Sequence, residues 1–381
     1  MRDWKTVRLG DVCEIVNGFA FDSKLFNTDK KGIPLIRIRD VIRGFSETYT
    51  TENADSRFLV KVGDLLIGMD GEFNCSLWKS EDSFLNQRVC KIVPNLELIN
   101  KDYVYYGLKG KLKEIEDKTS FVTVKHISSK QIENIVLKYP PLETQKQIAV
   151  QLDKCTALIA KHKQILEKYD ILIKSRFIEM FGDNPVKSGK WNVETLGDVC
   201  SSIVRGPFGS ALKKEFFVPK SDKTIKVYEQ KHAIQKSSTI GSYYITQEKY
   251  EELKRFECKP GDFLMSCSGT MGEFYQLPDK CEKGIINQAL CKFTLNNRIE
   301  SLFFLEWMKQ SIHNLETKGS GIQNVAAVSF IKQMPVFLPP MQLQNNFAAF
   351  VHQIDKSKFA VQKSLEKAET LYKSLMQEYF G

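Results

Sequence analysis

The sequence predicts an α+β (mixed α/β) fold, in which two similar globular domains are joined by two long helices that form an antiparallel coiled coil. Three observations support this prediction. The 381 residues suit two domains or three. Several short motifs occur twice in the same order, and each copy ends in a heptad-like apolar pattern that follows a proline pair. With 42% apolar and 27% charged residues, the chain has the composition of a protein that buries a core.

The repeated motifs indicate an internal duplication. They are a Leu-Gly-Asp-Val-Cys segment, a Gly-Asp turn that opens an apolar strand, an Asn-Gln pair and a Pro-Pro pair. Their positions are 9–13 and 196–200, 63–67 and 261–265, 86–87 and 287–288, and 140–141 and 339–340. Because collinear repeats are not expected by chance, we interpret the chain as two copies of a unit of about 190 residues. Each copy is a mixed α/β domain followed by a long helix, and the Asn-Gln pair belongs to the shared framework.

The helical segments carry the clearest periodicity. After each proline pair, seam positions recur at alternating spacings of three and four, and the two copies align at a constant offset of 199 residues, from Pro140 to Pro339. The predicted seam contains Leu152, Ile159, Leu166, Tyr169 and Ile173 in the first copy, and Val351, Ile354, Val361, Leu365 and Tyr372 in the second. Helices of this length are marginal alone, so we expect them to pair. The alternative is that each packs on its own domain, and the polar seam residues His162, Arg176 and Lys358 weaken the paired interpretation.

The predicted boundaries follow from the proline pairs, through which a helix cannot continue. The first domain spans 1–145, a central helix and linker 146–190, the second domain 191–344, and a C-terminal helix 345–381. A helix over 152–180 would be about 43 Å long, which corresponds to about 10 to 13 base pairs of duplex DNA. Such a spacing suits two half-sites on one face of a duplex, and two differing domains would make the whole site asymmetric.

Cysteine spacing and hydropathy indicate the compartment. The nine cysteines are scattered without a C-x-x-C pair, which favours buried free thiols over a zinc site or a disulfide framework. The chain lacks a secretory h-region and any long apolar run, so we expect a cytoplasmic protein with no membrane contact. The net charge of +9 permits a nucleic-acid partner but does not demand one.

Candidate DNA contacts in the first copy come from three segments. Alternation over 36–43 would place three arginines on one strand face, where they could bind guanine or phosphate; the alternative is a solvated face paired with Asp. A Gly-rich loop over 68–74 and a segment before the first proline pair supply the others, although the loop could equally be an ordinary hairpin turn. The candidates are Arg37, Arg39, Arg43, Asp70, Asn74, Thr123, Lys125 and His126.

The second copy offers a corresponding set. Its members are basic, amide or small polar residues that lie between the shared motifs, where two domains with different targets would differ. They are Ser268, Thr270, Gln323 and Asn324, with Arg205, Lys213, Lys214, Tyr228, Gln230, Lys231 and His232 as weaker candidates.

Catalytic motifs are missing from the sequence. No [ND]-P-P-[YF] segment is present to hold a target amine, and no glycine-rich turn fits a nucleotide or S-adenosylmethionine. The five histidines show no metal-ligand spacing. We therefore expect no catalytic residues, no bound metal and no cofactor in this chain.

Taken together, these motifs resemble the specificity subunit of a type I restriction-modification system. The resemblance covers essentially the whole chain, and its most specific part is the Pro-Pro-Leu-Glu-Thr-Gln segment that leads into the helix. It implies two target-recognition domains that read a split site in double-stranded DNA, held by a coiled-coil spacer. The residues that mark the junction of domain and helix would be Leu142, Glu143 and Gln145, and Met341, Gln342 and Gln344. Because Gln342 stands where the first copy has Glu143, a role for that acid is in doubt.

The resemblance also implies partners. Two methyltransferase subunits would methylate adenine N6 with S-adenosylmethionine, after flipping the adenine out of the duplex. Motor-endonuclease subunits that use ATP and Mg could join them, and the isolated chain could self-associate through its exposed helices. Two rival functions are a self-sufficient methyltransferase or nuclease with disguised motifs, and a coiled-coil adaptor that binds no nucleic acid.

Overall fold

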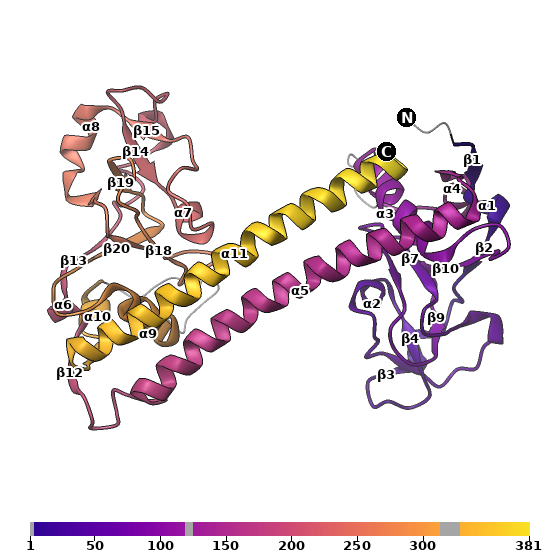
Figure 1. The fold of residues 1–381 in the computed structure, drawn as a ribbon, viewed down its shortest axis with the longest axis horizontal. Helices are drawn as coiled ribbons and strands as arrows, with labels where there is room; N and C mark the ends of the chain where they lie inside the picture. Colours follow the sequence, from indigo (N-terminus) through magenta and orange to yellow (C-terminus); the bar gives the residue numbers. More distant parts are fainter. Residues whose placement is uncertain (1–3, 119–124, 313–327) are drawn as a thin grey trace. The chain divides into compact units, whose positions relative to one another are not determined.

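The computed structural model describes residues 4–118, 125–312 and 328–381, and the chain divides into two compact units. Unit 1 comprises residues 1–165 and 361–381, and unit 2 comprises 166–360. Each unit contains one globular domain and part of two 40-residue helices, α5 (Leu142–Phe181) and α11 (Met341–Phe380) (Figure 1). The predicted fold class is therefore confirmed.

Unit 1 is built from two main sheets and a small strand pair. The first sheet has the antiparallel order β2 (Cys13–Asn17), β10 (Val89–Pro94), β7 (Leu65–Gly68), β8 (Cys75–Leu77). The second has the order β3 (Phe26–Asn27), β5 (Tyr49–Thr50), β4 (Ile33–Ile36), β9 (Ser83–Leu85), β6 (Leu59–Val60), in which β4 and β9 are parallel. Strand β1 (Thr6–Arg8) pairs with β11 (Val136–Lys138). The shorter helices are α1 (Leu9–Val12), α2 (Ile38–Arg43), α3 (Lys101–Lys118) and α4 (Ser129–Glu133), with 3-10 turns at Ser23–Leu25 and Ser56–Phe58.

Unit 2 has the same strand order in its principal sheet. That sheet is β13 (Cys200–Arg205), β20 (Leu290–Leu295), β17 (Phe263–Ser266), β18 (Phe274–Gln276). The second sheet is β15 (Tyr244–Ile245), β14 (Ile225–Tyr228), β19 (Gly284–Ile286), β16 (Glu257–Cys258), and β14 and β19 are again parallel. Strand β12 (Asn192–Thr195) pairs with β21 (Pro335–Leu338). The helices are α6 (Leu196–Val199), α7 (Gln230–Ile234), α8 (Gln247–Glu252), α9 (Ser301–Ser311) and α10 (Val328–Lys332), with 3-10 turns at Lys214–Phe216 and Lys254–Phe256.

The repeated Leu-Gly-Asp-Val segment forms a one-turn helix at the same place in both units. Leu9 and Leu196 are fully buried at the start of α1 and α6. The backbone N–H of Leu9 donates to Ile135 at 2.8 Å, and that of Leu196 donates to Met334 at 2.9 Å. The repeat is therefore a structural element that fastens the first strand of each domain to its last.

A buried glutamine fixes the start of each long helix. In unit 1 Nε2 of Gln145 donates to the Pro140 carbonyl at 2.9 Å, and its Oε1 accepts from Asn100 N at 2.9 Å. In unit 2 Nε2 of Gln344 donates to the Pro339 carbonyl at 2.9 Å, and its Oε1 accepts from Glu300 N at 2.8 Å. These bonds satisfy buried backbone groups and tie each helix to its domain. Glu143 is exposed and pairs only loosely with Lys146 at 3.8 Å, so the acid is not needed for the junction.

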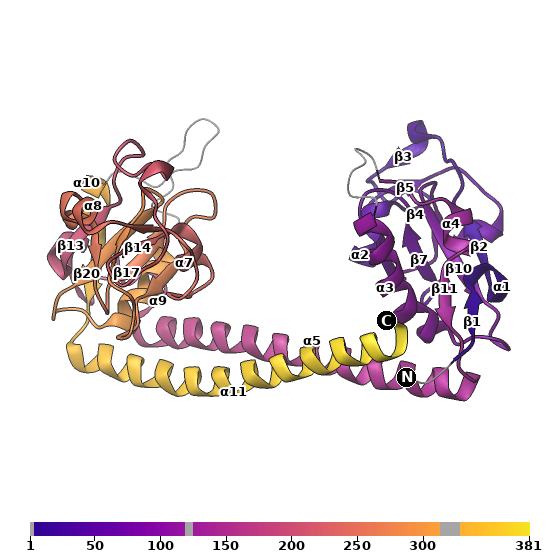
Figure 2. The ribbon, with the colours of Figure 1, turned by 90° about the horizontal axis from the view of Figure 1, so that it is seen from above.

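In each unit the two long helices run side by side in opposite directions (Figure 2). In unit 1, Gln151 accepts a hydrogen bond from the Tyr379 hydroxyl at 2.9 Å, and Lys163 pairs with Glu369 at 3.3 Å. In unit 2 the rings of Phe177 and Phe181 lie 5.3 and 5.9 Å from that of Phe347. Along these contacts the residue numbers rise on α5 and fall on α11, so the two helices pack antiparallel.

The seam prediction agrees with the observed burial, because none of the predicted seam side chains is exposed. Two polar seam residues find partners across the seam: Lys358 donates to Asp170 at 2.6 Å, and the Arg176 guanidinium lies 5.8 Å from the Phe350 ring centroid. Each helix pair also packs on its own domain. In unit 1 Tyr106 of α3 donates to Asp153 of α5 at 2.6 Å, and in unit 2 the Phe177 ring of α5 lies 5.5 Å from the Phe303 ring of α9. Both proposed packings therefore occur together.

Two further sequence predictions concern cysteines and membranes. All nine cysteines are free and only Cys281 is partly exposed. Burial raises the pKa of the Cys13, Cys75, Cys90 and Cys200 thiols to about 12, so these groups stay protonated. Within residues 4–118, 125–312 and 328–381, no helix is long and apolar enough to cross a membrane.

Candidate nucleic-acid interface

The same corner of the principal sheet is built in both units by a glycine against an asparagine carbonyl. A Cβ on Gly18, after β2, would lie 2.0 Å from the Asn86 oxygen, and a Cβ on Gly206, after β13, would lie 1.8 Å from the Asn287 oxygen. Only glycine permits this approach of two backbones. The backbone of the asparagine in each Asn-Gln pair is therefore part of the framework. In both units the glutamine that follows the asparagine is exposed at this corner.

In unit 1 this corner carries a small charged network. The Asp70 carboxylate lies 2.5 Å from His126 Nδ1 and 3.6 Å from Arg88 Nε. The segment that contains His126 is held beside the end of β7 because Ile127 N donates to Met69 O at 2.9 Å. Arg88 has a φ of +72°, a value uncommon for a residue with a side chain, and it projects from the turn before β10. The network places two basic side chains beside one acid on an exposed edge.

The structure thus brings Asp70 and His126, predicted from separate segments, into contact. Lys125 is turned toward Glu116, which it contacts at 3.2 Å, and Asn74 is half-buried in the loop that joins β7 to β8. Thr123 lies outside the described residues. Arg88 was not among the predicted residues, although its place directly after a repeated Asn-Gln pair was a usable signal.

The prediction that Arg37, Arg39 and Arg43 share one strand face is wrong. Strand β4 ends at Ile36, Arg37 is the N-cap residue, and the others lie on helix α2. The Asp40 carboxylate accepts from Arg37 N at 2.9 Å, and Gly44 ends the helix with a φ of +76°. A capping acid at the third position and a terminal glycine favour a short helix over a strand. Arg39 and Arg43 contact Asp40 at 3.7 Å and Glu47 at 3.6 Å.

In unit 2 the predicted residues Gln230, Ser268 and Thr270 come together after β17. Their polar groups form hydrogen bonds with one another. Gln230 Nε2 donates to the Ser268 carbonyl and, at 3.3 Å, to that of Thr270. The Ser268 hydroxyl lies 3.4 Å from Gln230 Oε1. The amide therefore holds the loop in shape. Lys231 pairs with Glu229 at 2.7 Å.

Other predicted residues of unit 2 have different positions. Tyr228 and His232 are wrong as surface candidates, because both side chains are fully buried. Burial lowers the pKa of His232, and its ring bonds Glu229 N at 2.8 Å and Ile240 O at 2.8 Å. Lys213 and Lys214 are exposed, and Lys213 lies 3.6 Å from Glu215. Gln323 and Asn324 lie outside the described residues.

Arg205 lines an open hollow at the corner of unit 2, with a volume of about 950 Å³. The hollow lies where β13 ends and β20 begins, the place that the charged network occupies in unit 1. Its other polar lining residues are Arg255, Ser268, Gln288 and Ser210. Gln288 belongs to the repeated Asn-Gln pair. Sequence analysis missed Arg255, which carries no motif.

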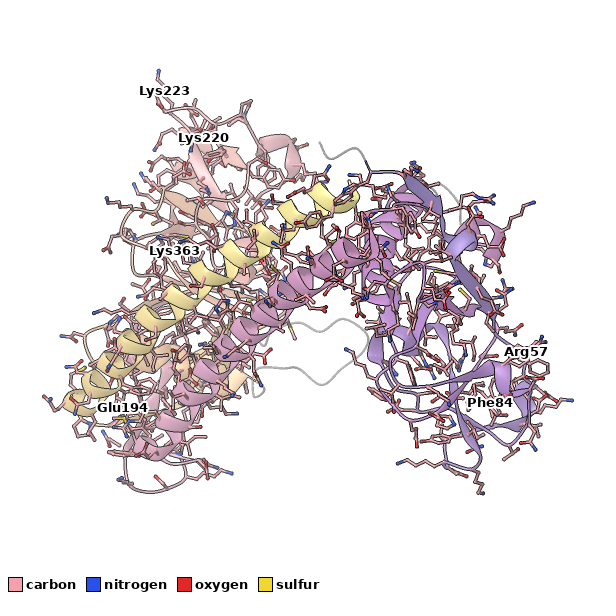
Figure 3. The ribbon with its side chains drawn as sticks, turned by 45° about the vertical axis from the view of Figure 1, so that its right-hand side comes forward. Arg57, Phe84, Glu194, Lys220, Lys223 and Lys363 are labelled. Carbon is pink, nitrogen blue, oxygen red and sulfur yellow. The ribbon has the colours of Figure 1, made fainter. Side chains whose placement is uncertain are left out.

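Some basic residues elsewhere on the domains have local partners. Figure 3 shows Lys220 and Lys223 at the outer rim of unit 2 and Arg57 at the outer rim of unit 1. Lys220 pairs with Glu282 at 2.8 Å, and the Arg57 guanidinium lies 4.6 Å from the Phe58 ring centroid. A count of cations therefore does not single out a candidate surface, and the corner that the two units share is the candidate that their common geometry offers.

Comparison with known proteins gives a consistent result. Residues 1–169 and 188–369 match a family described as "Type I restriction modification DNA specificity domain". A stretch of 171 residues is 44% identical to the EcoBI specificity subunit of Escherichia coli, covering 45% of this chain and 36% of that protein. The MjaVIII specificity subunit of Methanocaldococcus jannaschii is 21% identical over 98% of this chain and 91% of its own length.

Solved structures show the same fold. The S subunit of a type I restriction-modification system from M. genitalium matches with a TM-score of 0.59 at 15% identity, over 100% of this chain and 96% of that chain. A chain from a structural study of type I complex assembly and conformational transition matches with a TM-score of 0.56 at 16% identity, over 100% of this chain and 98% of that chain.

Proposed function

The chain belongs to the type I restriction-modification DNA specificity family, and from that premise we propose that it is the sequence-reading subunit of a cytoplasmic methyltransferase complex. Each unit would read one half of a bipartite, asymmetric site in double-stranded DNA. One observation carries the proposal: the two units share strand order and corner geometry but differ in the side chains at that corner. Two copies of one scaffold with different exposed residues suit two different targets.

The chain would be non-catalytic. Its partners would then supply the chemistry: two methyltransferase subunits with S-adenosylmethionine, and motor-endonuclease subunits with ATP and Mg where these take part. The chain's own role would be to hold the flanking DNA while a partner flips the target adenine. Incubation of the purified chain alone with S-adenosylmethionine and DNA should transfer no methyl group, and methylation by the chain alone would favour the self-sufficient enzyme instead.

A scaffold that binds two identical subunits must present the same surface twice. The constant offset of 199 residues relates Leu172 on α5 to Leu371 on α11, and these side chains are 44% and 52% exposed. Because burial of apolar surface drives most protein–protein association, a leucine exposed at both equivalent positions offers the same apolar contact twice. We place one methyltransferase contact at Leu172 and the other at Leu371.

If these leucines are the docking sites, substituting them should change the number of methyltransferase subunits that each chain binds. Leu172→Asp or Leu371→Asp should each leave a complex with one methyltransferase subunit, and the double variant should bind none, as measured by native mass spectrometry. Lys363→Ala, which alters an exposed residue of α11 (Figure 3), should keep both subunits. Two bound subunits in the double variant would contradict these docking sites.

The function itself is tested by single-molecule sequencing of methylated adenines in cells that express this chain with its methyltransferase partner. The proposal expects one motif made of two specific half-sites separated by a gap of unspecified sequence. A single continuous motif, or no motif together with no DNA retention by the complex at low salt, would contradict it, the latter in favour of an adaptor.

A further inference from the structure

Phe208 is the most exposed large apolar side chain in the described part of the chain, at 89%. It stands in the Gly206-Pro207-Phe208-Gly209 loop directly after β13. Burying a phenylalanine side chain stabilises a protein or complex, because its apolar surface leaves water. In the unbound chain the Phe208 ring remains in water, so its burial can stabilise a complex with a partner.

The backbone of the loop is anchored on both sides of Phe208. On one side Gly206 N donates to Leu290 O at 3.0 Å, and Pro207 is buried. On the other side the Phe208 carbonyl accepts from Ala211 N at 2.9 Å, and Leu212 is only 4% exposed. A side chain presented on an anchored turn loses little backbone entropy when it binds.

Unit 1 uses its equivalent loop differently. The matching glycines align Phe208 with Ala20, which is exposed but small. The neighbours of Ala20 are core residues: the Phe19 ring lies 5.3 Å from that of Phe58, and the Phe21 ring lies 5.2 Å from that of Phe84. An exposed aromatic is therefore not a requirement of the shared framework but a property of unit 2.

The surroundings of Phe208 indicate its partner. Phe208 lines the same hollow as Arg205 and Arg255, and no acidic residue contributes to the described lining. Two guanidinium groups beside an apolar ring match a ligand that combines phosphates with flat, stackable rings. Duplex DNA has that chemistry, whereas an apolar protein surface would offer no anionic group to the two arginines.

We propose that Phe208 is a wedge that inserts against a base step of the half-site read by unit 2, while Arg205 and Arg255 contact the flanking phosphates. This inference rests on the proposed function. An apolar wedge partly unstacks one step and bends the duplex. Unit 1, with Ala20 at this position, has no wedge and leaves its own half-site stacked at the corresponding step.

The test uses the complex of the full chain with its two methyltransferase subunits, and a duplex that carries the sequenced site. The fluorescent base 2-aminopurine, which brightens when it unstacks, replaces in turn each adenine of either strand in both half-sites. Apart from the target adenines that the methyltransferase subunits flip, the wild-type complex should brighten one step, in the half-site of unit 2. Phe208→Ala should abolish that signal and weaken binding by about tenfold, within the range of aromatic–base contacts.

Two further variants make the result specific. Phe208→Trp should retain the signal, since it keeps a large flat ring. Leu96→Ala, which truncates a 67% exposed leucine of unit 1, should leave signal and affinity unchanged. Phe208→Ala should fold normally, because the side chain that it removes contacts little.

The possible outcomes separate the two proposals. Equal fluorescence and affinity in wild type and Phe208→Ala would overturn the wedge and leave the proposed function intact. Loss of a methyltransferase subunit from Phe208→Ala would also overturn it, because Phe208 would then be a protein contact. If the wild-type complex binds no bipartite duplex at all, the proposed function and the wedge both fail.

Discussion

The corner of the principal sheet, compared between the two units, separates the shared framework from the proposed reading surface. Both units place a glycine against an asparagine carbonyl there, at 2.0 and 1.8 Å from an added Cβ. Around this shared turn, unit 1 gathers Asp70, Arg88 and His126, whereas unit 2 opens a hollow beside Phe208. The two units thus keep the same backbone geometry where a side chain in place of glycine would clash. Around that turn they carry different side chains.

A second pair of positions shows the same principle in the interior. The first short helix after the parallel strand is capped from its third residue by Asp40 in unit 1 and by His232 in unit 2. Both side chains are buried and both accept the N-cap N–H, at 2.9 and 2.8 Å. A carboxylate and a neutral imidazole thus satisfy one backbone donor in two chemically different ways.

The largest expected effect comes from breaking the shared turn. Gly18→Ala and Gly206→Ala should each destabilise their own unit by about 3 kcal/mol or more, because the new Cβ overlaps backbone atoms that cannot move aside. Gly209→Ala is the control, since nothing lies within 4 Å of its added Cβ. Urea unfolding, with hydrogen exchange to assign the loss to one unit, measures the effect. Equal stability of Gly206→Ala and Gly209→Ala would show that the turn is not constrained.

A smaller and symmetric effect is expected at the helix starts. Gln145→Leu and Gln344→Leu each leave a buried carbonyl and a buried N–H without their partners, which should cost about 2–4 kcal/mol per variant. Because the two glutamines make matching bonds, thermal unfolding should give similar losses for the two. A large loss in one unit and none in the other would contradict the equivalence of the junctions.

An asymmetric effect is expected at the reading surface. Arg88→Ala should reduce binding to the cognate duplex by about 1–2 kcal/mol and relax preference only in the half-site of unit 1. Arg8→Ala, which removes an exposed arginine paired with Asp11, should change neither. Competition binding against duplexes mutated in one half-site provides the measurement. Relaxed preference in the half-site of unit 2 would reverse the assignment.

The smallest effect is a pH dependence confined to unit 2. The pKa of His232 is lowered by burial, so the unfolded chain binds this proton more readily than the folded chain. The contribution of neutral His232 to folding stability is therefore present above the histidine pKa of the unfolded chain, about 6.5, and is lost as the pH falls below that pKa. Hydrogen exchange between pH 7.5 and 5.5 should show α7 weakening before α2. His232→Asn, which can still accept at the cap, should remove this difference, and its persistence would exclude His232 as the cause.

Much of the fold could be predicted from the sequence because the residues that build the framework occur at equivalent positions in both copies. Leu9 and Leu196, and Gln145 and Gln344, recur because buried contacts tolerate few replacements. The heptad positions were equally readable, since a helix seam has a fixed period.

The reading surface was harder to predict. Alternation over eight residues could not distinguish a strand from a capped helix, so the Arg37–Arg43 prediction failed. The contact between Asp70 and His126 depends on tertiary pairing of segments 56 residues apart. Tyr228 and His232 look polar in sequence but serve the core. Phe208 was missed because an apolar residue in a loop carries no periodic signal, and only its exposure marks it.

The central claim is that one chain carries two independent readers on a repeated scaffold. It is tested most directly by replacing residues 191–344 with the same segment of another family member and sequencing methylated adenines in cells that also express the methyltransferase partner. If the two readers are independent, one half-site of the methylated motif should change while the other half-site and the gap stay the same. A change in both half-sites would contradict it.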